Sequence, residues 1–208
     1  MVDDMGRFEV DLEEDQHGTY FFNSRDMNLS AHIQDLVDAG IDSLKIEGRA
    51  KSVYYVATVA RAYRKIVDVV ETHHNASLRD KIIKEQQKQL DGLGNRGYSK
   101  GFLLGNEPEH NFEGALSQTD YKFAAQIEGK KKINGQVFNI VFMHNEMFLK
   151  DKLEAVSPKG NEKVKIKNIL NYKLEKVTEA HGGHDKRFFV QFDKVLANKT
   201  LLRRKLTK

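Results

Sequence analysis

The sequence predicts an α+β protein in which the terminal β/α units of a (β/α) barrel are followed by a small antiparallel β-barrel domain. Residues 19–70 alternate between strand-like and helix-like segments, which is typical of a parallel sheet covered by helices. From Tyr121 onward, short runs of strand-forming residues alternate with glycine-containing turns, which is typical of a small antiparallel barrel or sandwich.

These patterns divide the chain into four expected segments. Residues 1–18 are an acidic, flexible lead-in, residues 19–93 a partial (β/α) barrel segment, residues 94–120 a connecting loop and residues 121–208 the β-barrel domain. A complete (β/α) barrel needs about 250 residues. We therefore expect the barrel segment to pack against something else or to continue a barrel that lies upstream.

The first half reads as strand, helix, strand, helix. Residues 19–22 favour a strand. The helical spacing of apolar residues that begins at Leu29 ends at Gly40, because glycine adopts a positive φ without steric cost. Residues 41–46 favour a second strand, and Ser52 can cap the helix that follows. That helix carries an apolar face made by Val56, Val59, Ala60, Tyr63, Ile66, Val67 and Val70.

The second half reads mainly as strands. Residues 71–93 favour a linker or an exposed helix that ends near Gly92. Turns are expected at Asn134-Gly135 and at residues 158–161. The candidate strands are residues 121–128, 136–143, 152–157, 162–170 and 187–193. The basic segment 199–205 is either a final strand with a charged edge or a contact for RNA phosphates.

Charge is distributed unevenly along the chain. Residues 1–100 contain 14 Lys and Arg against 17 Asp and Glu, whereas residues 101–208 contain 20 against 13. A basic half favours a polyanionic partner such as tRNA or another RNA, although a lysine-rich solvated surface gives the same count.

Several classes of protein are disfavoured. The chain has no cysteine, which excludes disulfides, a thiol nucleophile and a cysteine-ligated metal cluster within it. The eight histidines show no metal-binding spacing. No apolar run is long enough to span a membrane, and the acidic start lacks the pattern of a secretory signal. We therefore expect a cytoplasmic protein that has no metal site and does not bind membranes.

The first candidate site lies where the second predicted strand meets a helix, the edge at which parallel α/β folds carry their active sites. Lys45 and Glu47 are expected on one face of that strand as catalytic residues, together with Arg49, which can bind a carboxylate or phosphate through two hydrogen bonds. Gly48 and Lys51 are expected to bind substrate. The alternative is an exposed ion pair beside a helix start.

The second candidate site follows the first predicted strand. Asn23, Ser24, Arg25 and Asp26 are expected to bind substrate at the same rim. Ser24 or Asp26 can equally cap the following helix.

The same segments carry a family resemblance. Tyr20–Asp26 and Gly40–Arg49 resemble the "NS(K/R)D … GIDSLKIEGR" core of peptidase family U32, and Lys51–Ala57 resembles its "KSxYYVA" continuation. Asn95–Phe102 resembles the "RGYTxGF" segment of the family, and the part from Tyr121 resembles its appended β-barrel.

The resemblance implies a function for a longer parent protein. Family members are known as collagenase-like proteases, and several support hydroxylation of a tRNA wobble uridine or a ribosomal RNA cytidine, with prephenate implicated. These members carry cysteines for an iron–sulfur cluster upstream of the segment that begins here near Thr19. The resemblance thus implies a cluster in the parent, none in this chain, and a C-terminal portion that is inactive alone.

We expect the parent to act in tRNA wobble-uridine hydroxylation, because the chain offers no Ser/His/Asp set, metal-binding pair or paired carboxylates for peptide hydrolysis. The alternatives are a protease with a protein or peptide substrate, and a non-catalytic module whose β-barrel binds RNA or protein.

Overall fold

The computed structural model describes residues 12–15, 18–21, 23–73, 75–105, 110–111, 119–182 and 187–206. The chain divides into two compact units. The first unit comprises Met1–Arg49 and Thr58–Thr119, and the second comprises Ala50–Ala57 and Asp120–Lys208. Most of the acidic lead-in predicted for residues 1–18 lies outside the described residues.

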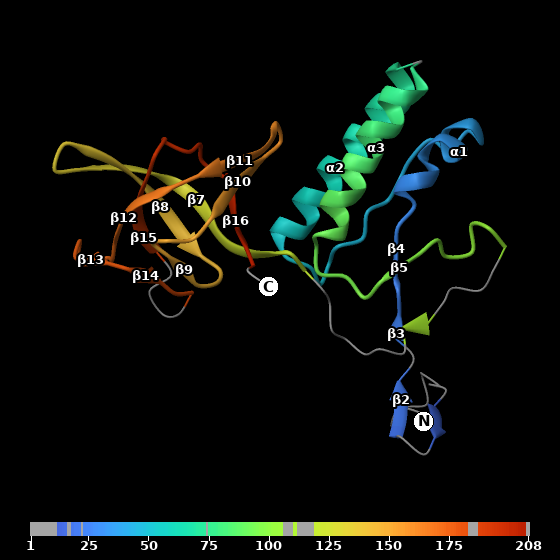
Figure 1. The fold of residues 1–208 in the computed structure, drawn as a ribbon, viewed down its shortest axis with the longest axis horizontal. Coiled ribbons are helices and arrows are strands. Elements are labelled where there is room, and N and C mark those ends of the chain that lie inside the picture. Colours follow the sequence, from blue (N-terminus) through green and yellow to red (C-terminus); the bar gives the residue numbers. More distant parts are fainter. Residues whose placement is uncertain are drawn as a thin grey trace. The chain divides into compact units, whose positions relative to one another are not determined.

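The first unit is built around three helices (Figure 1). They are α1 (Ile33–Asp38), which follows the 3-10 turn η1 (Ser30–His32), then α2 (Val53–Thr72) and α3 (Ala76–Asp91). Helix α2 belongs to this unit from Thr58 onward, and its first turn belongs to the second unit. The short strands are β1 (Leu12–Asp15), β2 (Gly18–Phe21), β3 (Asn23–Ser24), β4 (Asp26–Met27), β5 (Tyr98–Ser99) and β6 (His110–Asn111). Its core contains Ile33, Ile66 and Val70, against which Leu36, Tyr63, Val67 and Ile83 pack.

The predicted helix ends are confirmed. Gly40 has a φ of +76°, and its N–H donates to the Val37 carbonyl while the Ile41 N–H donates to the Leu36 carbonyl. This pair of bonds is the Schellman arrangement that a glycine in the left-handed region allows. The Ser52 hydroxyl accepts from the Tyr55 N–H at 3.2 Å and so caps the start of α2.

The parallel sheet predicted for residues 19–70 is wrong for the described part of the chain. Strand β2 pairs antiparallel with β1. Residues 41–48 form no strand, and Ile41, Leu44 and Ile46 are 50%, 39% and 38% exposed. A strand is stable only when a neighbouring strand accepts its backbone hydrogen bonds. No described segment offers that edge to residues 41–46, so the apolar segment remains irregular and exposed.

The second unit is an antiparallel sheet, as predicted. Eight strands pair in the order β11-β10-β16-β7-β8-β15-β12-β13, and β9 pairs separately with β14. The strands are β7 (Tyr121–Ile133), β8 (Gln136–Met143), β9 (Met147–Phe148), β10 (Leu153–Ser157), β11 (Gly160–Val164), β12 (Ile166–Leu170), β13 (Lys176–Val177), β14 (Glu179–Ala180), β15 (Arg187–Phe192) and β16 (Leu201–Lys205). Strands β11 and β13 remain at the two ends, so the pairing of the described residues does not close the predicted barrel.

Local turn chemistry sets the register of this sheet. Asn134 and Gly135 have φ values of 47° and 79°, and they join β7 to β8 by the two-residue turn that matches the strand twist. Inward-facing residues such as Ile127, Val141 and Leu202 are fully buried and form the core. In Figure 1, β7 and β8 (yellow) extend as a long hairpin.

Candidate functional site

Two segments far apart in the sequence meet beside β4. Strand β4 pairs in parallel with β5, and the Asp26 N–H donates to the Gly97 carbonyl at 2.9 Å. The Arg96 side chain donates from both Nε and Nη2 to one oxygen of Asp26, at 3.1 and 2.8 Å. The Asp26 side chain is only 10% exposed, so Arg96 compensates a largely desolvated carboxylate.

A second polar contact lies next to this ion pair in the sequence. The Tyr63 hydroxyl of α2 donates to Asn28 Oδ1 at 3.1 Å and accepts from the Leu29 N–H at 3.0 Å. Asn28 Oδ1 also accepts from the Ser30 N–H at 3.0 Å. These bonds fix the chain as it passes from β4 into η1, and they hold the Asp26 region against α2.

Glycines allow the segment after α3 to approach closely. Gly97 has a φ of +83°, and a Cβ there would lie 3.5 Å from Arg25 Cδ. Gly101 has a φ of +57°, and a Cβ there would lie 2.9 Å from Met27 Sδ. Larger residues would strain the backbone at both positions, and at Gly101 they would also displace the end of the exposed Met27 side chain.

The structure gives the predicted binding residues different environments. The Arg25 side chain lies beside Gly97, with its Cδ 3.5 Å from where a Cβ would stand, and Asp26 pairs with Arg96. The backbones of Asn23 and Ser24 pair with β6, and their side chains lie outside the described part of the chain. Sequence reasoning did not identify Arg96 as the partner of Asp26. The sequence does contain a clue to this pair, because the two residues have opposite charges and both lie in segments that resemble the family.

The predicted catalytic residues lie in the irregular segment before α2. Lys45, Glu47 and Arg49 are exposed, and Glu47 Oε1 accepts from the Arg49 N–H at 3.2 Å. Gly48 is half-buried, and Lys51 in the second unit places its Nζ 4.9 Å from the centre of the Tyr55 ring. Lys45 and Glu47 do not share a strand face, because residues 41–48 form no strand. Their catalytic role stays a prediction.

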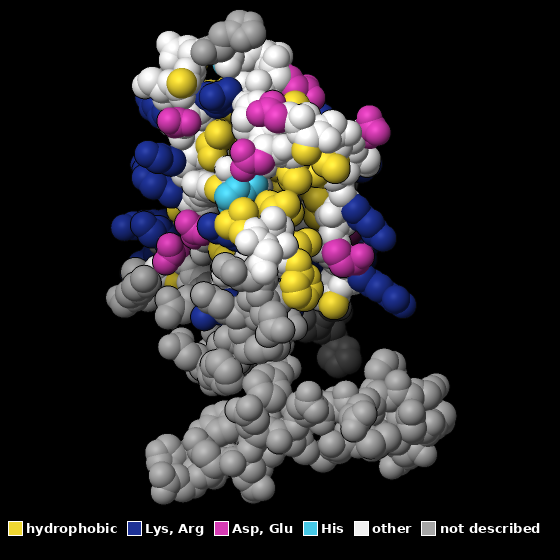
Figure 2. Space-filling view, turned by 90° about the vertical axis from the view of Figure 1, so that its right-hand side faces the viewer, with side chains coloured by type: hydrophobic (Ala, Val, Ile, Leu, Met, Phe, Trp, Pro, Cys, Tyr) yellow, Lys and Arg dark blue, Asp and Glu magenta, His cyan; other side chains and the backbone are white. Residues whose placement is uncertain are grey.

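An apolar groove borders this segment. It has a volume of about 380 Å³ and is lined by α1, the 41–46 segment and α2, including Leu36, Val37, Ile41, Leu44 and Val67. Figure 2 shows hydrophobic side chains gathered on this side of the molecule, with charged ones around them. The groove lining contains few ionisable groups, so it resembles a packing surface more than a reaction site.

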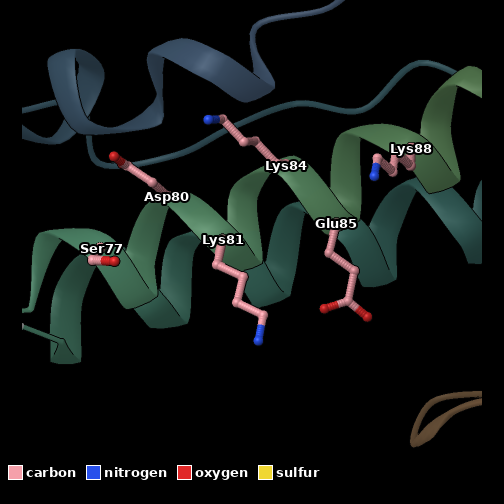
Figure 3. Close-up of a pocket in the computed structure, with 6 residues that line it drawn as sticks. All are labelled: Ser77, Asp80, Lys81, Lys84, Glu85 and Lys88. Atoms are coloured by element: carbon pink, nitrogen blue, oxygen red, sulfur yellow. The ribbon is translucent and has the colours of Figure 1, made fainter.

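A larger hollow runs along α3. It has a volume of about 760 Å³ and is lined by six polar side chains: Ser77, Asp80, Lys81, Lys84, Glu85 and Lys88. Figure 3 shows that Asp80 and Lys84 point to one side of the helix whereas Lys81 and Glu85 point to the other. Side chains that diverge in this way do not converge on a ligand.

The buried charges of the second unit serve packing. Arg203 is 3% exposed, and its guanidinium donates to Glu154 Oε2 at 2.9 and 2.6 Å and to the Tyr54 hydroxyl at 3.3 Å. Burial alone lowers the pKa of Arg203, but the hydrogen bonds to Tyr54 and Glu154 outweigh it and raise that pKa above its ordinary value. Tyr54, in the segment that resembles "KSxYYVA", is therefore a structural residue.

Among the described residues, no group of three or more His, Cys, Asp or Glu side chains could hold a metal ion. None of the described helices is both long and apolar enough to cross a membrane.

The geometry defines an α+β protein with a small helical unit and an antiparallel sheet unit. The family model for peptidase family U32 matches residues 4–113, and the chain belongs to this family.

Named relatives extend the match into the sheet unit. The chain is 38% identical over 175 residues to tRNA hydroxylation protein P of Haemophilus influenzae, covering 82% of this chain and 36% of that protein. It is 35% identical over 172 residues to the protein of the same name in Escherichia coli, covering 81% and 36%. A collagenase of Porphyromonas gingivalis is 26% identical over 175 residues, covering 83% and 41%. The chain thus spans little more than a third of the length of these relatives.

Proposed function

We propose that this chain is the C-terminal portion of a protein that acts in tRNA hydroxylation, with the wobble uridine as the modified base. One observation carries the proposal: the chain is 38% and 35% identical to two proteins named for tRNA hydroxylation but 26% identical to the collagenase. Residues 121–208 support it, since 20 Lys and Arg against 9 Asp and Glu suit an RNA partner. Such a role places the protein in the cytoplasm.

The residues before α2 have the chemistry for binding an anionic substrate. Lys45 and Arg49 present exposed cations within one short segment, in which the Arg49 N–H also donates to the Glu47 carboxylate. Asp26 is already compensated by Arg96, so its role is to position the neighbouring chain for substrate.

The iron–sulfur cluster implied for the parent does not fit the residues of this chain. A cluster of this kind is held mainly by cysteine thiolates, and the sequence contains none. Its ligands would have to come from another part of the parent. The chain would contribute substrate contacts around Lys45–Lys51 and an RNA-binding sheet.

A deletion strain tests the proposal. Deleting the gene in its native organism should abolish hydroxyuridine in tRNA, measured by mass spectrometry of digested tRNA, and the intact gene should restore it. Restoration should be lost with Arg49→Ala and Lys45→Ala but kept with Lys84→Ala, an exposed lysine on α3. Unchanged hydroxyuridine in the deletion strain would refute the proposal.

The match to a collagenase favours proteolysis as a second candidate function. The full-length parent should then cleave gelatin, and the same Arg49→Ala change should lower that cleavage. A third candidate is a non-catalytic module, for which the chain would bind RNA or protein while the deletion strain keeps both its tRNA modification and its protease activity.

A further inference from the structure

The outer face of the sheet in the second unit carries a continuous cross-strand row. Residues directly opposite on paired strands point to the same side of a sheet. Ile140 of β8, Phe189 of β15, Leu170 of β12 and Lys176 of β13 are opposite one another in turn. Their neighbours point the other way, into the core: Val141, Val190 and Ile169, which are at most 1% exposed. The row therefore faces away from the main core, and Leu170 and Phe189 belong to a second, smaller apolar cluster with Ile133 and Phe138 on this face.

Basic side chains lie over half-buried aromatic rings on this outer face. Lys131 Nζ lies 5.1 Å from the centre of the Phe189 ring. One row further along, Arg187 is opposite Phe142, and its guanidinium carbon lies 5.6 Å from the centre of that ring. These distances are within the range of cation–π contacts. The ring of Phe142 on β8 and the ring of Phe189 on β15 thus each lie beside one cation, Arg187 of β15 and Lys131 of β7.

Charge and shape together indicate the partner. Glu128 forms an ion pair with Arg187, which leaves Lys131 and Lys176 as the cations that offset phosphates. An acidic peptide would complement these lysines, but its carboxylates do not stack on the negative faces of aromatic rings. RNA supplies both, because unpaired bases stack on aromatic side chains while their phosphates bind lysine.

We propose that this face, made by Lys131, Phe142, Lys176, Arg187 and Phe189, binds unpaired nucleotides of tRNA. The identity of the RNA rests on the proposed function; the stacking surface itself rests on the geometry of the sheet. Bases contact the rings of Phe142 and Phe189, and phosphates contact Lys131 and Lys176.

This surface is tested by measuring how the 208-residue chain binds an unmodified tRNA transcript. Fluorescence anisotropy gives the affinity at each salt concentration of a series. Lys131→Gln with Lys176→Gln should reduce the slope of log affinity against log salt by about 1.4, since each single-strand phosphate contact contributes about 0.7. The matched control is Lys159→Gln with Lys163→Gln, which removes the same charge from exposed positions at β10 and β11 and should leave the slope unchanged.

The stacking contribution has its own variant. Phe142→Leu keeps an apolar side chain but removes the ring, and it should weaken binding about fivefold or more without changing the salt slope. Circular dichroism of each variant verifies the fold. Unchanged affinity in Phe142→Leu would overturn the proposal.

Three further outcomes would overturn it. Equal losses in the two lysine pairs would mean that diffuse charge drives binding. Binding of polyglutamate that is as tight as tRNA binding and equally sensitive to Phe142→Leu would indicate a protein partner. If the deletion strain loses hydroxyuridine but a gene carrying all three outer-face changes restores it fully, this surface is refuted while the proposed function stands. If the deletion strain keeps hydroxyuridine, the proposed function fails whatever the binding result.

Discussion

The buried ion pair between Arg203 and Glu154 offers the sharpest test of what holds the sheet together. Arg203 is 3% exposed and Glu154 has a side chain that is 20% exposed. Glu154→Gln keeps the shape of the side chain but removes the charge that compensates the buried guanidinium. Breaking a fully buried pair costs about 3–5 kcal/mol. Because Glu154 is partly hydrated, we expect a cost of about 2 kcal/mol, within the range for hydrogen bonds to charged groups.

Hydrogen exchange measures this cost locally. Backbone amides of β10 and β16, which pair directly through these residues, should lose roughly thirtyfold in protection, since 1.4 kcal/mol corresponds to about a factor of ten. The matched control is Glu128→Gln, which breaks an exposed pair with Arg187 and should cost below about 1 kcal/mol.

A double variant separates the charge effect from packing. Arg203→Met combined with Glu154→Leu should recover most of the lost protection, because replacing a buried pair by apolar residues of similar volume is often neutral or stabilising. If Glu154→Gln costs no more than Glu128→Gln, the reasoning from burial is refuted.

Three further predictions concern a turn, a second ion pair and pH. Gly135→Ala should lower the unfolding free energy by about 1 kcal/mol, because φ there is 79°; the Cβ would meet no atom within 4 Å, so the backbone strain acts alone. The control Gly129→Ala, where the Cβ makes only an ordinary contact at 3.8 Å, should change the unfolding free energy less. Urea titration of both variants measures the difference. Arg96→Met should destabilise the first unit by about 2 kcal/mol in the same assay, because it leaves a largely buried carboxylate uncompensated; no change would contradict the structural role of the pair. A hydrogen bond from Lys122 lowers the pKa of Glu146. The stabilisation by this ionised carboxylate is therefore present above the ordinary glutamate pKa and is lost as pH falls through the lowered value. Glu146→Gln should make unfolding less sensitive to acid, which melting curves at several pH values would measure.

The sequence by itself determined much of the local structure. Gly40 and Ser52 mark helix ends because a left-handed φ and a capping hydroxyl act within one turn of chain. The turn at Asn134-Gly135 and the limits of β8 follow from similarly local chemistry. The family was also evident from short motifs, and the family match over residues 4–113 confirms it.

Only the tertiary structure decided which segments pair. Residues 41–46 have the composition of a strand, yet they remain irregular because a strand depends on a neighbour that local sequence does not specify. The strand pairing of the described residues also does not close the predicted barrel, because strand order is set by long-range contacts. Likewise, Asp26 and Arg96 are 70 residues apart, and their ion pair exists only because β4 and β5 bring the two segments together.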